Sequence, residues 1–130
     1  MLNRKGYALL VVLAVSVILS ASAIALWSSA NLDMMIAANN KRINQAKIAA
    51  TSGLNHFISL GLSPAQLANI SRESGIVIPN TNLTSKTFYN VNLKTVCCNS
   101  ERYIITSTGY YKKGNKIIAE YPMRSSWIVQ

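Results

Sequence analysis

The most reactive side chains in this sequence belong to two adjacent cysteines, Cys97 and Cys98. Neighbouring Cα atoms lie about 3.8 Å apart, whereas an unstrained disulfide spans roughly 4.4 to 6.8 Å, so a bond within the pair would be strained. Because the chain has no third cysteine, the alternatives are this strained disulfide, two thiols, or a bridge to another chain. Redox catalysis favours a Cys-x-x-Cys spacing and a metal site needs more ligands, so the pair predicts neither.

The other titratable groups are scattered. His56 is the single histidine, and the acids Asp33, Glu73, Glu101 and Glu120 stand far apart in the sequence. Acid–base catalysis needs such groups within hydrogen-bond reach of the proton they transfer, and no nucleophile motif or glycine-rich phosphate loop accompanies them. We therefore expect a protein that is not an enzyme and that uses no cofactor and no metal.

Lysines and tyrosines gather in one short stretch near the C-terminus. Lys112, Lys113 and Lys116 flank a predicted hairpin turn, and Tyr110 and Tyr111 precede them. Cations interleaved with aromatic rings can contact a nucleic-acid backbone or another anionic polymer, so DNA or an anionic polymer is a candidate partner. The same lysines could instead protect an edge strand from unwanted pairing and keep the domain soluble. Both interpretations stay open.

The elements that must position these side chains have contrasting compositions. The chain has 130 residues, 50% of them hydrophobic, and 13 Lys and Arg against 4 Asp and Glu give a net charge of +9. This length allows one small domain and an appendage. Residues 41–130 hold 11 of the cations and 3 of the acids. The basic excess therefore belongs mostly to the later part of the chain.

The apolar excess belongs to the front. Residues 7–27 are 21 uncharged residues, mainly Leu, Val, Ile and Ala, without Pro or Gly, and about 20 such residues span a bilayer as a helix. Arg4 and Lys5 precede this run, so the positive-inside rule predicts a cytoplasmic N-terminus. We expect a single-pass protein with its C-terminal head outside the cytoplasm.

Three interpretations of this segment remain open. It could be a removable secretory signal with Ala21-Ser22-Ala23 as the cut site, so that the mature chain begins at Ile24. It could be a plain membrane anchor that keeps Met1. It could also be the first half of a longer helix that continues outside the membrane.

The residues after the apolar run favour a longer helix. Pro and Gly are absent between Gly6 and Gly53, and apolar residues recur at steps of three, four and seven, which keeps them on one helical face. This stripe comprises Leu32, Ile36, Ile43, Ala46, Ala50, Leu54, Phe57 and Ile58. We expect a membrane helix at residues 7–28 and an amphipathic continuation at residues 29–60. One helix of this length would measure about 80 Å.

Residues 61–130 predict a small β-rich head. Ser63 and Pro64 are typical of a helix start and precede a short helical pattern. Residues 88–93, 102–111 and 116–121 are expected strands, and residues 80–86 a polar loop. Residues 76–78 form a short strand or an extended connection, and residues 125–130 could add an edge strand. A head of this size has a marginal core by itself, so we expect the apolar stripe of the long helix to complete it. The predicted fold class is α+β, with one long helix packed on a small antiparallel sheet.

The front of the chain resembles a known family. A short basic leader of residues 1–6 ends in Gly6, Tyr7 follows directly, and ALLVVLAVSVILSASAIALW runs into the long helix. This arrangement is similar to the class III signal of type IV pilins and type II secretion pseudopilins. The resemblance covers about the first 55 residues. It implies cleavage by a prepilin peptidase after Gly6, methylation of the new N-terminus at Tyr7, and a bacterial inner-membrane subunit that assembles with other pilin or pseudopilin subunits into a cell-surface filament.

One position departs from the family pattern. Most members carry a glutamate as the fifth residue after the cut, where it pairs with a neighbouring subunit, and this chain has Val11 there. The departure resembles the minor subunits proposed to sit at the filament tip. The resemblance therefore implies a minor pilin whose assembly helix includes Val11 and Trp27. The loop disulfide common in pilins has no counterpart in this sequence.

Overall fold

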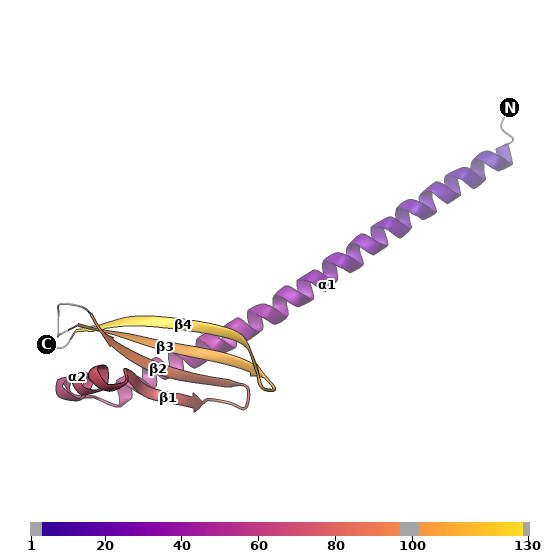
Figure 1. The fold of residues 1–130 in the computed structure, drawn as a ribbon. Helices are drawn as coiled ribbons and strands as arrows, with labels where there is room; N and C mark the ends of the chain where they lie inside the picture. Colours follow the sequence, from indigo (N-terminus) through magenta and orange to yellow (C-terminus); the bar gives the residue numbers. More distant parts are fainter. Residues whose placement is uncertain (1–3, 97–101, 129–130) are drawn as a thin grey trace. The chain divides into compact units, whose positions relative to one another are not determined.

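The computed structural model describes residues 4–96 and 102–128, with the backbone alone at residues 4 and 5. In chain order the elements are α1 (Arg4–Ser59), α2 (Pro64–Glu73), β1 (Ile76–Asn82), β2 (Thr87–Thr95), β3 (Arg102–Lys113) and β4 (Lys116–Ile128) (Figure 1). The chain divides into two compact units, Met1–Asn39 and Asn40–Gln130. We describe the two units separately.

The first unit holds the N-terminal part of α1. No proline or glycine occurs in this helix between Gly6 and Gly53, so nothing in the sequence interrupts its hydrogen-bond ladder. Three serine hydroxyls donate to the carbonyl oxygen four residues earlier, at 2.8 Å for Ser16 and Ser20 and 2.9 Å for Ser22. These bonds give each hydroxyl a partner within its own helix, which suits an apolar environment.

The second unit is an antiparallel sheet with the C-terminal part of α1 on one face. The strand order is β1-β2-β3-β4, so each strand pairs with its neighbour in sequence and β1 and β4 form the two edges. Ala46, Ala49 and Ala50 of α1 are fully buried against this sheet. The predicted α+β fold, with a long N-terminal helix packed on an antiparallel sheet, is confirmed.

Small residues let α1 approach β3 very closely. A side chain at Gly109 of β3 would overlap the backbone of Ala46 and Ala50, and one at Gly53 of α1 would overlap Ser107 and Tyr89. The buried Ser107 hydroxyl donates to the Ala50 carbonyl oxygen at 2.7 Å. The contact between α1 and β3 therefore leaves no room for a side chain at Gly109 or Gly53.

The larger apolar side chains fill the core beside this contact. They are Phe57 of α1, Leu67 of α2 and the odd-numbered strand residues Tyr89, Val91, Leu93, Tyr103 and Ile105, with Ile78 from β1. The odd numbering follows from the strand period of two, which turns alternate side chains to opposite faces. Because Phe57 and Leu67 belong to this core, α2 contributes to the same face of the sheet as α1.

Local signals fix the start of α2. Ser63 is the N-cap, and Pro64 occupies the first turn, where its missing N–H leaves no hydrogen bond unmade. The Gln66 side chain accepts from the Ser63 amide at 2.9 Å and completes a capping box. The predicted helix start is confirmed here.

All four strands are longer than the sequence indicates, and the difference is largest in β1 and β4. β1 extends to Asn82, so residues 80–82 belong to a strand where we predicted a loop. β4 runs for 13 residues to Ile128, so the described part of the predicted edge strand at 125–130 continues β4 and adds no fifth strand. Both strands contain a proline and both lie at sheet edges, where one side of the strand needs no ladder hydrogen bond.

Candidate functional site

The predicted processing and assembly residues lie on an exposed helix. Within α1, Tyr7 is 65% exposed, Val11 44% and Trp27 74%. A Cβ added at Gly6 would meet no side chain of the described residues beyond its chain neighbours within 4 Å. Among the described residues α1 is the one helix long and apolar enough to cross a membrane, by length and composition, over the segment from Gly6 to Ser59. The residues of its most apolar stretch are exposed.

The predicted basic cluster lies at the turn between β3 and β4. Lys113 pairs with Lys116 across this turn, where Gly114 has a φ of 63°. Lys112 precedes the turn, and its Nζ lies 5.7 Å from the centroid of the Phe88 ring. The three lysines are therefore close together at one end of the sheet, as their spacing in the sequence indicates.

The two tyrosines of the cluster lie on opposite faces of the sheet. The Tyr110 ring stacks on Phe88, with centroids 4.7 Å apart and planes at 14°. Tyr111 belongs to the other face, because it pairs with the buried residues Thr87 and Ala119. Only Tyr110 thus shares a face with Lys112, and Phe88 is the aromatic neighbour that the sequence cluster did not include.

We call the face away from α1 the outer sheet face, formed by the even-numbered residues 88–94 of β2, 102–112 of β3 and 120–128 of β4. Cross-strand pairing places Lys94 beside Ile104, and Arg124 beside Thr106. Arg102 and Lys112 lie on the same face of β3. These four cations are far apart in the sequence. The alternation of side chains along each strand is the sequence signal that could have predicted their common face.

Uncharged polar groups occupy the middle of the outer sheet face. Asn92 pairs with Thr106, and Asn90 pairs with Thr108. The Asn90 Nδ2 donates to the Asn80 Oδ1 of β1 at 3.2 Å. Glu120, opposite Tyr110, is the one acid on this face within the described residues. The face combines hydrogen-bonding groups with an excess of positive charge.

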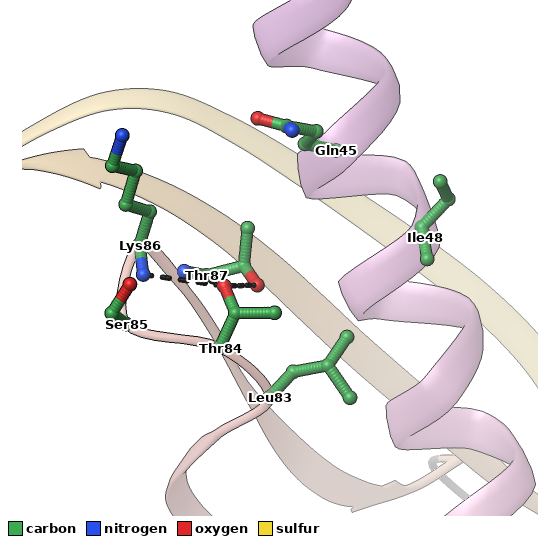
Figure 2. Close-up of a pocket in the computed structure, with 7 residues that line it drawn as sticks. All are labelled: Gln45, Ile48, Leu83, Thr84, Ser85, Lys86 and Thr87. Atoms are coloured by element: carbon green, nitrogen blue, oxygen red, sulfur yellow. Dashed lines mark hydrogen bonds between the residues drawn. The ribbon is translucent and has the colours of Figure 1, made fainter.

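A cavity of about 430 Å³ lies beside α1 in the second unit. Figure 2 shows Gln45 and Ile48 of α1 on one side and the loop from Leu83 to Thr87 on the other. The Thr84 hydroxyl stabilises this loop by accepting from the amides of Lys86 at 3.2 Å and Thr87 at 3.1 Å. The lining offers apolar walls, hydroxyls and one ammonium group, with neither an acid nor a histidine for proton transfer.

The sole histidine has a structural partner. His56 Nδ1 lies 2.8 Å from the Tyr89 hydroxyl, and the two rings meet edge to face with centroids 6.1 Å apart. This bond links the C-terminal part of α1 to β2.

The predicted acids Glu73 and Glu120 lie on different elements, at the end of α2 and on β4. No group of three metal-ligating side chains occurs among the residues that the structure describes.

Three predicted residues fall elsewhere. Cys97, Cys98 and Glu101 lie outside the described residues.

In comparisons with known proteins, no family model, no curated protein and no solved structure matches this chain.

Proposed function

We propose that this protein is a minor pilin-like or pseudopilin-like subunit, held in a bacterial inner membrane by the front of α1 and assembled with other subunits into, or at the start of, a type IV pilus or type II secretion filament. The observation that carries the proposal is the nature of α1. After Arg4 and Lys5, α1 runs from Gly6 as an exposed, uncharged apolar helix, and its C-terminal part is buried on an antiparallel sheet.

Two features support this assignment over a plain anchor. An anchor needs only about 20 apolar residues, whereas here a single helix continues from the apolar segment to Ser59. Exposed apolar residues also continue past the predicted membrane segment, at Leu32, Met35 and Ile36. Apolar side chains in this region need cover from another molecule, and packing against neighbouring subunits would supply it.

The maturation of the N-terminus tests the proposal. The full-length chain would be expressed in bacterial membranes with and without a prepilin peptidase, and its N-terminus determined by sequencing and intact mass. We expect a mature chain that starts at methylated Tyr7 only when the peptidase is present. A start at Ile24 would identify a secreted domain, and a peptidase-independent Met1 would identify a simple anchor, so either result contradicts the proposal.

A pair of variants controls for indirect effects. Gly6→Val places a side chain where the described residues beyond its chain neighbours leave open space, so the fold should tolerate it while cleavage is lost. Ala8→Val adds comparable bulk to another exposed position beyond the junction. We expect Ala8→Val to be processed and to co-sediment with sheared filaments, and Gly6→Val to remain in the membrane fraction.

A further inference from the structure

We propose that the outer sheet face binds the phosphodiester backbone of double-stranded nucleic acid without reading its base sequence. The inference does not depend on filament assembly, because it uses residues of the second unit alone. It assigns binding to a face of the sheet rather than to the tip of the β3–β4 hairpin.

The distribution of charge on this face is the first argument. Lys94, Arg102 and Arg124 lie toward one end and Lys112 lies toward the other, while Glu120 is the one acid on the face within the described residues. Lys94, Arg102 and Arg124 are exposed and Lys112 is half-buried. A surface with one predominant sign of charge attracts a polymer of the opposite sign.

Edge protection can account only for Arg124, which lies on the edge strand β4. Lysines that block unwanted strand pairing are expected on edge strands. Lys94 lies on β2, and Arg102 and Lys112 lie on β3, which are the two central strands of the sheet. Their side chains therefore serve the face and cannot shield an edge.

The spacing of the cations fits an extended polymer. In the register of the sheet, Arg124 and Lys94 are level with positions six and eight residues from Lys112 along β3. At about 3.4 Å per residue these positions lie roughly 20 to 27 Å from Lys112. Duplex DNA carries one negative charge per about 1.7 Å of its axis, so a duplex lying along β3 offers phosphates to both ends of the face.

The aromatic pair favours a duplex over a single strand. A single-strand site stacks bases on ring faces that are free to receive them. Here Phe88 and Tyr110 stack on each other, and the Lys112 ammonium lies over the Phe88 ring. The rings thus cover one another, and the exposed Asn92 farther along the face can donate to phosphate oxygens as duplex-backbone contacts do.

The test measures how the full-length chain, kept in a neutral detergent, binds a fluorescently labelled DNA duplex of about two helical turns. Binding is followed by fluorescence anisotropy at several salt concentrations. The face variant combines Lys94→Gln, Lys112→Gln and Arg124→Gln. The control combines Lys41→Gln, Lys47→Gln and Arg72→Gln, which removes the same charge from α1 and α2. The two sets are matched further because Lys47, like Lys112, lies over an aromatic ring, that of Tyr121.

We expect the face variant to bind at least tenfold more weakly, with a log–log salt slope smaller by about 2 to 3, because each phosphate contact contributes about 0.9. The control should stay within about twofold of the unmodified chain. Equal losses in both variants would show that net charge alone drives binding and would overturn the proposal. Tighter binding of a single strand, or binding of an acidic polysaccharide but no duplex, would overturn it as well. Circular dichroism checks that both variants fold, and Lys94→Gln alone, exposed on β2, repeats the test should the triple variant unfold.

Discussion

Replacing Gly109 by alanine is expected to separate α1 from the sheet. Gly109 is not one of the described glycines that have a positive φ. The strand β3 therefore requires glycine here for its small size and not for its conformational freedom. The added Cβ would overlap the carbonyl oxygen of Ala46 and the amide nitrogen of Ala50. These are backbone atoms of a helix and cannot rotate away, so α1 must move outward.

The magnitude follows from the contacts that this movement disrupts. Overpacking a tight interior costs about 1 to 3 kcal/mol. Outward movement of α1 also breaks the buried hydrogen bond from Ser107 to Ala50, which contributes about 1 kcal/mol. The total of about 2 to 4 kcal/mol is a large part of the roughly 5 to 15 kcal/mol that stabilises a typical domain. For a unit of this size the melting temperature should fall by roughly 10 to 30 °C.

Thermal unfolding of the full-length chain in detergent, followed by the circular dichroism of the sheet, measures this change. Gly114→Asn is the matched control, since Gly114 has open space around it and asparagine accepts its φ of 63°. We expect the control to melt within about 4 °C of the unmodified chain, equivalent to less than about 1 kcal/mol. If Gly109→Ala melted within the same range, the close approach of α1 to β3 would be refuted.

Two further changes test other parts of the molecule. Ser63→Ala removes the N-cap of α2 and should lower the free energy of unfolding by about 1 kcal/mol in urea titrations, and an unchanged midpoint would contradict the capping box. Glu120→Gln removes the one acid of the outer sheet face within the described residues and should strengthen duplex binding several-fold at low salt, with less gain at high salt, while weaker binding would contradict the placement of the nucleic acid on that face.

The helical part of the fold was predictable because its signals are local. Ala46, Ala50 and Phe57 recur at helical spacing and are buried on the sheet, whereas Ile43 and Ile58 of the predicted stripe are exposed. The strand limits were harder, because Pro79 and Pro122 read as strand breakers. Their positions on the edge strands β1 and β4 depend on strand order, which is a property of the whole sheet.

The candidate site shows the same limit at the level of single side chains. Adjacency in sequence grouped Tyr110 with Tyr111, although neighbours in a strand point to opposite faces. The structure pairs Tyr110 with Phe88, which lies 22 positions earlier. Sequence spacing located the lysines of the hairpin, whereas the cations on β2 and β4 join them only once the register is known.

The close contact between α1 and β3 also explains why the two faces of the sheet differ. Gly109 and Ser107 lie on the inner face, where α1 packs so closely that larger side chains do not fit. The opposite face then has no structural duty that would require cations on central strands. A requirement for solubility alone would be met by charges of either sign. On the outer sheet face, however, the described residues include four cations, Lys94, Arg102, Lys112 and Arg124, and one acid, Glu120. The one-sided charge of this face is therefore better explained by an anionic partner than by solubility.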